Sequence, residues 1–366
     1  MVAIGFTGGG TGGHIYPGLA VIARIRELPG GEERRIFWIG SDRGMDRAVV
    51  EGAGVKFYGI PSGKLRRYAS FKNFTDLFRI AAGFFAARRI LKREKPALLF
   101  SKGGFVSVPP CAAAASLGIP LFSHESDYSP GLATRLNSRL AEKVFIPYNE
   151  TCLFFTEARR KKLELSGNPI RPLFWEARAA KGRTFLGAAP GERILLVLGG
   201  SQGSREINAL VEKSLPGLLE DYTVVHQTGE QGGEPESRTG EGLPGRYLPY
   251  AYIGEELPHV IAAAELIFCR SGAGTIWECG VLGKPMILLP LRGSGTRGDQ
   301  VENARVFREA GAALVAEPRP EELIRLVREL SGNEEKRKAM AEGAARITGL
   351  DGARIIAEAI LRRIEK

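Results

Sequence analysis

The stretch Gly8-Gly9-Gly10-Thr11-Gly12-Gly13-His14-Ile15-Tyr16-Pro17 directly follows an apolar run at residues 2–6. Its five glycines lack Cβ atoms, so backbone N–H groups can close on a ligand, and Pro17 suits the first turn of a helix. A helix that begins behind such a loop has free N–H groups and a partial positive charge, which can hold an anion without a lysine. We therefore predict a strand, then a cradle for a phosphate or a sugar, then a helix.

His14 stands at the lip of this predicted cradle. A lone histidine in a turn is more often a packed side chain than a functional one. This one belongs to a ligand-facing loop rather than to an apolar stripe, which favours a functional role.

The composition is that of a globular protein with two domains. The chain has 366 residues, 44% of them hydrophobic, and a prior of roughly 100 to 200 residues per domain suggests two domains. No apolar run approaches the roughly 20 residues that span a bilayer. Because the first strand begins directly after Met1, no room remains for a signal peptide, which predicts a cytoplasmic chain. The four cysteines are scattered without C-x-x-C spacing, which indicates buried thiols and no metal site.

The excess of positive charge lies in the first half of the chain. Residues 1–165 contain 25 Lys and Arg against 14 Asp and Glu, a balance of +11, whereas residues 166–366 have a balance of −1. A basic half predicts an anionic partner such as a membrane surface or a phosphorylated substrate. Nucleic acid is disfavoured, because the sequence has no zinc-finger spacing, arginine-rich tail or RNP-like signature.

Strands and helices alternate along both halves. Buried strands are predicted at 2–6, 35–39, 55–60, 97–100, 121–123, 143–146, 194–198, 222–226, 266–269 and 286–289. This alternation predicts parallel, doubly wound sheets with ligands at the carboxyl ends of the strands. Because Ser-Gly-Asn-Pro at 166–169 interrupts the pattern, we predict two tandem Rossmann-like domains, 1–165 and 166–349, that face each other across a cleft. The amphipathic helix at about 350–366 is expected to pack back on the first domain.

A helix predicted at 70–95 has an apolar arc wider than burial in a core requires. One interpretation is a core helix with cations at its C-terminus, where they are favourable with the helix dipole. An apolar face flanked by basic residues is also typical of a protein that lies on an anionic membrane. The residues we assign to such a membrane face are Phe74, Phe78, Phe84, Phe85, Arg88, Arg89, Lys92 and Arg93.

Motifs for the common nucleotide folds are weak or missing. Gly8, Gly10 and Gly13 match G-x-G-x-x-G, but the second strand ends in Ile39-Gly40-Ser41 without the acidic residue that a dinucleotide site requires. The chain has no G-x-x-x-x-G-K-[ST] and no Asp-x-Asp, which argues against a P-loop and against a metal-bridged nucleotide sugar. Charge on a leaving group would then be stabilised by helix dipoles, backbone N–H groups and arginines.

Seven motifs in order resemble the MurG family, which comprises bacterial peripheral membrane glycosyltransferases with the GT-B fold. The resemblance covers essentially the whole chain and rests on residues 9–18, 102–107, 124–127, 167–171, 199–204, 269–275 with Glu278, and 299–303. It implies transfer of N-acetylglucosamine from UDP-GlcNAc onto undecaprenyl-diphospho-MurNAc-pentapeptide, lipid I to lipid II, without a cofactor. It also implies a location on the cytoplasmic face of the inner membrane, an acceptor-binding first domain, a donor-binding second domain and candidate partners among cell-wall or division proteins.

The resemblance assigns the donor site residue by residue. Ser201 and Thr275 would hold the diphosphate, with Arg171 nearby, and the backbone of Ile253 would pair with uracil. Glu278 would accept from the ribose diol, and Gln300 with Asn303 would bind sugar hydroxyls. The remaining substrate-binding residues that it implies are Thr11, Gly12, Gly13, Asp127, Ser271, Ala273 and Gly274.

Two motifs depart from the family pattern. The family usually has His-Glu-Gln-Asn where this chain has His124-Glu125-Ser126-Asp127, so a carboxylate replaces an amide. Gly274 stands where a larger apolar residue is common.

The implied reaction is one inverting displacement, and a base must take the proton from the 4-hydroxyl of N-acetylmuramic acid. The candidates are His14, His124 and Glu125. We favour His14 because the imidazole pKa suits neutral pH and because its loop is expected to face the cleft from the acceptor side, whereas His124 and Glu125 are expected to orient the sugar or the base. Two alternatives remain open: another GT-B transferase that acts on a membrane lipid, and a scaffold that binds a nucleotide sugar without turnover.

Overall fold

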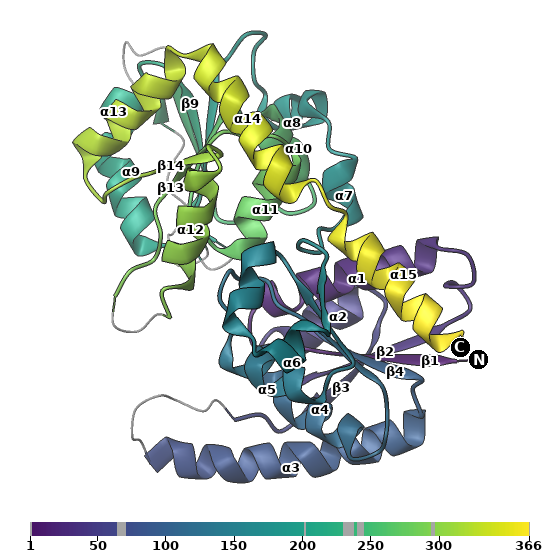
Figure 1. Ribbon diagram of the computed structural model, residues 1–366. Helices are drawn as coiled ribbons and strands as arrows, with labels where there is room; N and C mark the ends of the chain where they lie inside the picture. Colours follow the sequence, from purple (N-terminus) through teal and green to yellow (C-terminus); the bar gives the residue numbers. More distant parts are fainter. Residues whose placement is uncertain are drawn as a thin grey trace. The chain divides into compact units, whose positions relative to one another are not determined.

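The computed structural model describes residues 2–63, 71–200, 203–229, 238–239, 245–293 and 297–365, with the backbone alone for 71–75 and 238–239. It divides into two compact units, one made of Met1–Pro172 with Leu350–Lys366 and the other of Leu173–Gly349. Each unit has its own largely parallel sheet with helices packed against it (Figure 1). The α/β class predicted from the sequence is confirmed.

The first unit contains seven parallel strands in the order β3-β2-β1-β4-β5-β6-β7. The strands are β1 (Ala3–Thr7), β2 (Arg35–Ser41), β3 (Lys56–Ile60), β4 (Leu98–Ser101), β5 (Leu121–His124), β6 (Lys143–Ile146) and β7 (Leu163–Leu165). The helical segments are η1 (Gly12–His14), α1 (Tyr16–Glu27), α2 (Asp46–Gly52), α3 (Phe71–Glu94), η2 (Phe105–Ser107), α4 (Val108–Ala115), α5 (Leu132–Leu140), η3 (Asn149–Phe154), α6 (Glu157–Arg160) and α15 (Gly352–Ile364).

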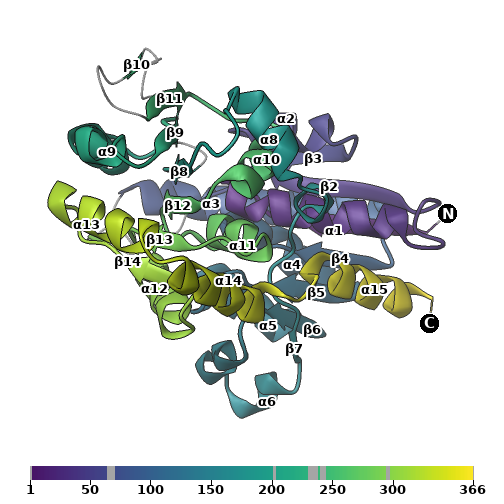
Figure 2. The ribbon, with the colours of Figure 1, turned by 90° about the horizontal axis from the view of Figure 1, so that it is seen from above.

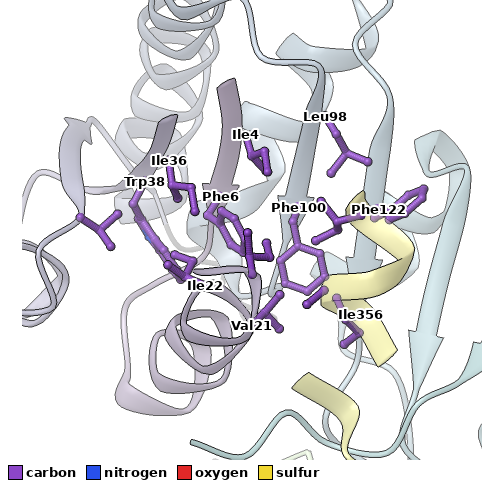
Figure 3. Close-up of a cluster of buried hydrophobic side chains, with 14 of the residues drawn as sticks. Ile4, Phe6, Val21, Ile22, Ile36, Trp38, Leu98, Phe100, Phe122 and Ile356 are labelled. Carbon is purple, nitrogen blue, oxygen red and sulfur yellow. The ribbon is translucent and has the colours of Figure 1, made fainter. Parts of the chain in front are cut away.

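The core of this unit explains why its strands are continuous apolar runs. On one face, Phe6, Trp38 and Phe100 from three neighbouring strands pack with Val21 of α1 and Ile356 of α15 (Figure 3). The other face is buried under α3 and α4. A parallel sheet covered on both faces requires apolar side chains on both sides of each strand.

The last helix of the chain belongs to the first unit. Figures 1 and 2 both show α15 beside α1, and the two helices are in contact. Arg24 of α1 also pairs with Asp351, which caps α15, at 3.0 Å.

The second unit has the strand order β10-β11-β9-β8-β12-β13-β14, in which only β10 is antiparallel to its neighbour. The strands are β8 (Ile194–Leu198), β9 (Thr223–Gln227), β10 (Arg238–Thr239), β11 (Arg246–Tyr250), β12 (Leu266–Cys269), β13 (Met286–Leu288) and β14 (Ala313–Val315). The helices are α7 (Pro172–Trp175), α8 (Ala179–Leu186), α9 (Arg205–Leu218), α10 (Leu257–Ala263), α11 (Ala273–Val281), α12 (Asp299–Glu309), α13 (Pro320–Ser331) and α14 (Glu334–Thr348).

The strand order places the glycine loops of each unit together. In the first unit the order reverses between β1 and β4, whose last residues Thr7 and Ser101 are paired. In the second it reverses between β8 and β12, whose last residues Leu198 and Cys269 are paired. Open α/β sheets bind ligands outside the carboxyl ends of the strands at such a reversal.

Candidate active site

The glycine loop after β1 packs directly on the loop after β4. A Cβ on Gly10, whose φ is 85°, would lie 2.7 Å from the Phe105 ring. A Cβ on Gly104, whose φ is 76°, would lie 2.9 Å from both Gly9 O and His14 Cδ2. Glycine is required at both positions because of the backbone angle and the close approach.

His14 lies at the end of this loop, in the turn that leads into α1. Its N–H donates to Thr11 O at 3.0 Å, which closes the turn, and its half-buried ring lies against Gly104. Thr11 and Gly13 are exposed, whereas Gly12 is buried. The loop therefore presents backbone and one imidazole at the edge of the sheet.

Asp46 at the start of α2 holds this loop in shape, although no sequence motif singles it out. Its fully buried carboxylate accepts from Ser41 N–H at 3.0 Å and from Gly10 N–H at 3.0 and 3.2 Å. A Cβ on Gly9 would lie 1.9 Å from Asp46 Oδ2, so this glycine makes room for the carboxylate. Burial raises the pKa of Asp46, and the backbone hydrogen bonds oppose that rise.

The hydrogen bonds of His124 and Glu125 indicate structural roles. His124 is fully buried, and its Nε2 lies 3.0 Å from Gly167 O, so Nε2 carries the proton. Burial lowers the pKa of His124 well below its ordinary value, which keeps the ring neutral. The carboxylate of Glu125 accepts from three backbone N–H groups, those of Ser126 at 2.8 Å, Asp127 at 3.1 Å and Gly131 at 2.9 Å. Neither geometry favours a base, so His14 is the remaining candidate of the three.

Lys102, the first residue of the motif at 102–107, contacts the loop after β5. It follows β4 directly, is 1% exposed, and its Nζ donates to Ser126 Oγ at 2.6 Å. Asp127, on the same loop as Ser126, is half-buried.

Arg171 belongs to the first unit, beside the start of α1. Its guanidinium lies 5.2 Å from the centre of the Tyr16 ring, which is a cation–π contact. The resemblance implies that Arg171 lies near the nucleotide, and the structure places its guanidinium against the helix behind the His14 loop.

In the second unit, Arg270 fixes the start of α9. Its guanidinium donates to Leu289 O at 3.1 Å, to Ser204 Oγ at 2.9 Å and to Glu206 Oε2 at 2.6 Å. Ser204 caps α9 by accepting from Ile207 N–H. Arg270 thus joins the ends of two strands to the helix behind the loop at 199–204. Ser201, our candidate for the diphosphate, lies outside the described residues.

The N-terminus of α11 is open. Gly272 precedes the helix and makes no side-chain cap, and Gly274 in the first turn is exposed. A Cβ on Gly274 would meet nothing within 4 Å, so the departure from the family pattern leaves free space there. Thr275 follows in the same turn, and Glu278 lies about one turn further along; both are half-buried.

The polar residues around α11 and α12 differ in what they can reach. Ser271 is buried and donates to Gln300 O at 2.8 Å, and buried Asn303 donates to Ser271 O at 3.2 Å. Gln300 is half-buried, and its Oε1 accepts from Leu291 N–H at 3.0 Å. Ser271 and Asn303 therefore join the loop to the helix, whereas Gln300 presents its amide nitrogen near Gly272.

The backbone N–H of Ile253 also has a hydrogen-bond partner within the second unit. The resemblance implies that the backbone around Ile253 pairs with uracil. The residue is 1% exposed, and its N–H donates to Gln227 Oε1 at 3.0 Å. Among the residues that the structure describes, no three or more His, Cys, Asp or Glu side chains form a group that could hold a metal ion.

Two Rossmann-like units, each with glycine loops and helix N-termini at the reversal of its strand order, are the architecture expected of a two-domain glycosyltransferase. The glycosyltransferase family 28 N-terminal domain matches residues 4–146, and the family 28 C-terminal domain matches residues 194–355. The chain belongs to glycosyltransferase family 28.

Curated relatives are similar over nearly the whole length. A protein of Treponema denticola is 45% identical over 98% of this chain and 97% of its own, and one of Clostridium perfringens is 40% identical over 90% of each. Both are called UDP-N-acetylglucosamine--N-acetylmuramyl-(pentapeptide) pyrophosphoryl-undecaprenol N-acetylglucosamine transferase.

Solved structures share the fold. MurG of Acinetobacter baumannii has a TM-score of 0.71 at 22% identity, covering 99% of this chain and all of its own. UDP-GlcNAc 2-epimerase of Neisseria meningitidis, bound to UDP-GlcNAc, has a TM-score of 0.68 at 16% identity with the same coverage. Likeness at these identities shows the fold alone.

Proposed function

We propose that the chain transfers N-acetylglucosamine from UDP-GlcNAc to the 4-hydroxyl of the N-acetylmuramic acid of undecaprenyl-diphospho-MurNAc-pentapeptide. The observation that carries the proposal is 45% identity, over 98% of the chain, to a protein called by that activity. The glycine loops support it, because each unit has a loop of the kind that binds a phosphate or a sugar.

The donor binds to the second unit in this proposal. The open N-terminus of α11, with Gly274 and Thr275, suits the diphosphate, since free N–H groups and the helix dipole favour an anion. Glu278 suits the ribose diol as an acceptor-only carboxylate. Gln300 suits a sugar hydroxyl, since its amide nitrogen can donate while its oxygen is held by Leu291.

The acceptor binds to the first unit, with His14 as the base. The acceptor oxygen forms a bond to C1 of the donor sugar while the bond from C1 to the UDP oxygen breaks. His14 takes the hydroxyl proton, and UDP leaves with the bonding electrons. One displacement of this kind turns an α-linked donor into a β-linked product.

We also propose that α3 rests on the anionic cytoplasmic face of the inner membrane, because the lipid carrier of the acceptor stays in the bilayer. Leu77, Phe78 and Phe85 are exposed by 57%, 63% and 69%, and Arg89 and Lys92 are exposed further along the helix. Each basic residue near an anionic surface contributes about 1 kcal/mol. None of the helices in the described part of the chain is long and apolar enough to cross a membrane.

The other members of the predicted membrane face differ. Phe84 is half-buried and packs against the core beneath α3, so its placement on that face is corrected. Arg88 is half-buried and donates to Ser116 Oγ at 3.3 Å. Arg93 is exposed like Arg89 and Lys92, and its guanidinium lies over the Tyr58 ring at 4.9 Å. The side chain of Phe74 lies outside the described residues.

The direct test is release of UDP from UDP-GlcNAc with and without a lipid I analogue, in the presence of EDTA. We expect release that depends on the acceptor and persists with the chelator. Release with diacylglycerol instead of lipid I would favour the alternative membrane-lipid transferase. Binding of UDP-GlcNAc without any release would favour the scaffold.

A further inference from the structure

The segment Gly103-Gly104 lies against His14, on the acceptor side of the proposed reaction. Both glycines have positive φ angles, 86° and 76°, and a Cβ on Gly104 would lie 2.9 Å from His14 Cδ2. Glycine restrains its own backbone less than any other residue. The position of the His14 ring therefore depends on other groups that fix these two residues.

Two serines hold this segment at its two ends. Ser101 Oγ accepts from Gly103 N–H at 3.2 Å. The Ser107 hydroxyl donates to Gly104 O at 2.8 Å, and Ser107 N–H donates to the same oxygen at 3.1 Å. Both serines are fully buried, so solvent does not compete for these hydrogen bonds.

Asn137 of α5 joins the two serines. Its Nδ2 donates to Ser101 Oγ at 3.2 Å and to Ser107 Oγ at 2.9 Å, and the residue is 1% exposed. One amide group thus orients both hydroxyls and, through them, both ends of the Gly103-Gly104 segment.

The buried amide of Asn137 costs the fold stability. Asparagine is mostly an exposed residue, and within the part of the chain that the structure describes Asn137 Oδ1 has no hydrogen-bond partner. A buried acceptor that is left unsatisfied is unfavourable, so a leucine would suit this position of α5 better. What Asn137 supplies and leucine would not are the two donors of its amide group, which points to a functional reason for keeping it.

We propose, on the basis of the proposed function, that Asn137 is a positioning residue for the base. Through Ser101 and Ser107 it fixes the Gly103-Gly104 segment. This segment forms a wall beside the His14 ring and holds the imidazole where it takes the proton from the acceptor hydroxyl. Asn137 is buried behind the loop and acts only through it.

The test measures kcat as UDP release, with saturating UDP-GlcNAc and a lipid I analogue, in Asn137→Asp and Asn137→Leu. A carboxylate only accepts, so Asn137→Asp draws the hydrogen of the Ser107 hydroxyl away from Gly104 O. Asn137→Leu removes the donors and keeps a side chain of similar shape. We expect kcat to fall about tenfold or more in both variants, because a small displacement of a catalytic group is costly. The Kd for UDP, which binds to the second unit in our proposal, should change by less than about twofold.

The effect of Asn137 must disappear when the imidazole is absent. His14→Ala and the double variant His14→Ala/Asn137→Leu should have the same residual kcat, because a residue that acts through His14 has no further effect once that side chain is removed. A merely structural residue would lower kcat by the same factor in both backgrounds.

The matched control is Ser138→Ala. Ser138 is the next residue of α5 and is equally buried, but its hydroxyl donates to Arg135 O of the same helix at 3.0 Å. This variant should keep the kcat of the wild type. The melting temperature should not fall in Asn137→Leu, because an unsatisfied acceptor is removed. If Asn137→Asp does not fold, Asn137→Leu alone must still lower kcat.

Three results would each overturn the inference: an unchanged kcat in Asn137→Leu, an equal fall of kcat in Ser138→Ala, or a further fall by the same factor in the His14→Ala background. His14→Ala with the turnover of the wild type would instead contradict the base that we propose, and the inference with it. A wild type without acceptor-dependent UDP release would contradict the proposed function itself.

Discussion

Asp46 gives the sharpest test of how the His14 loop is held. Its two partners, Ser41 and Gly10, are both N–H donors, and an asparagine would turn its NH2 group toward one of them. Leaving a buried donor unsatisfied costs about 1–3 kcal/mol. We expect Asp46→Asn to lower the free energy of unfolding by about that amount and to lower turnover about tenfold or more, with the donor KM unchanged.

Denaturant unfolding and steady-state kinetics measure both effects. Asp42→Asn is the matched control, because Asp42 is 38% exposed and faces Arg79 at a loose 3.7 Å. An Asp46→Asn variant as stable and as active as this control would show that the carboxylate does not hold the loop.

Two buried histidines make stability depend on pH. Burial lowers the pKa of His226 to about 4 and that of His124 well below its ordinary value of 6.5. Between those values and 6.5 the unfolded chain binds protons that the folded chain does not, so stability falls as pH falls below about 6.5. Each histidine contributes at most about 1.4 kcal/mol per pH unit.

We therefore expect a lower free energy of unfolding at pH 5 than at pH 7, measured by denaturant titration. In His226→Gln the loss between these two pH values should be smaller. Equal stability of the wild type at both pH values would contradict the assignment of neutral, buried rings.

Some individual residues of the candidate site could be predicted from the sequence. The glycine pattern before Pro17 was sufficient to select the loop that contains His14. Asp46 was missed because its burial depends on space left by Gly9, which only the packed structure reveals. Burial of His124 and the engagement of Ile253 N–H with Gln227 depend in the same way on partners 43 and 26 residues away.

Substitution of two adjacent phenylalanines distinguishes the buried face of helix α3 from its exposed face. Phe85 is 69% exposed, whereas Phe84 packs on the core with Leu91 and Ala87. Phe85→Ser should weaken co-sedimentation with anionic vesicles and leave the melting temperature nearly unchanged. Phe84→Ser should lower the free energy of unfolding by about 1–3 kcal/mol, as loss of a partly buried apolar side chain does.

Vesicle co-sedimentation beside a thermal melt distinguishes the two variants. If Phe85→Ser still pelleted with the vesicles and melted as early as Phe84→Ser, α3 would be a core helix and the membrane proposal would fail.

In helix α12 we propose that Gln300 contacts the donor sugar, whereas Asn303 stabilises the fold. Gln300→Ala should reduce the preference for UDP-GlcNAc over UDP-glucose and UDP-GalNAc, because a site loses selectivity when its hydrogen-bond partner is removed. Asn303→Ala should instead lower stability, since this buried amide donates to Ser271 O. Competition kinetics with the three donors decide, and unchanged selectivity in Gln300→Ala would reject its role.

The interior strands were predictable because they are continuous apolar runs. Strands β7, β10, β11 and β14 were missed: β7, β10 and β14 are two or three residues long at the sheet edges, and β11 mixes charged, aromatic and proline residues. Such segments become strands through their neighbours in the sheet, which a local pattern does not contain.

For the molecule as a whole, the fold alone does not decide the activity. A glycosyltransferase and a UDP-GlcNAc 2-epimerase have nearly the same TM-score to this chain. Sites on a fold determine function, so the order of seven motifs and the identity to the Treponema denticola protein carry the conclusion. The basic balance of residues 1–165 adds an independent reason to place the anionic, lipid-linked acceptor with the first unit.

The central claim is transfer with inversion to one hydroxyl, and NMR of the product tests it most directly. After incubation with UDP-GlcNAc and a lipid I analogue, we expect a disaccharide in which N-acetylglucosamine is β-linked to the 4-position of N-acetylmuramic acid. The anomeric coupling constant gives the configuration, and through-bond correlations to C4 give the position. An α-linked product, a different position, or UDP release without any disaccharide would contradict the account.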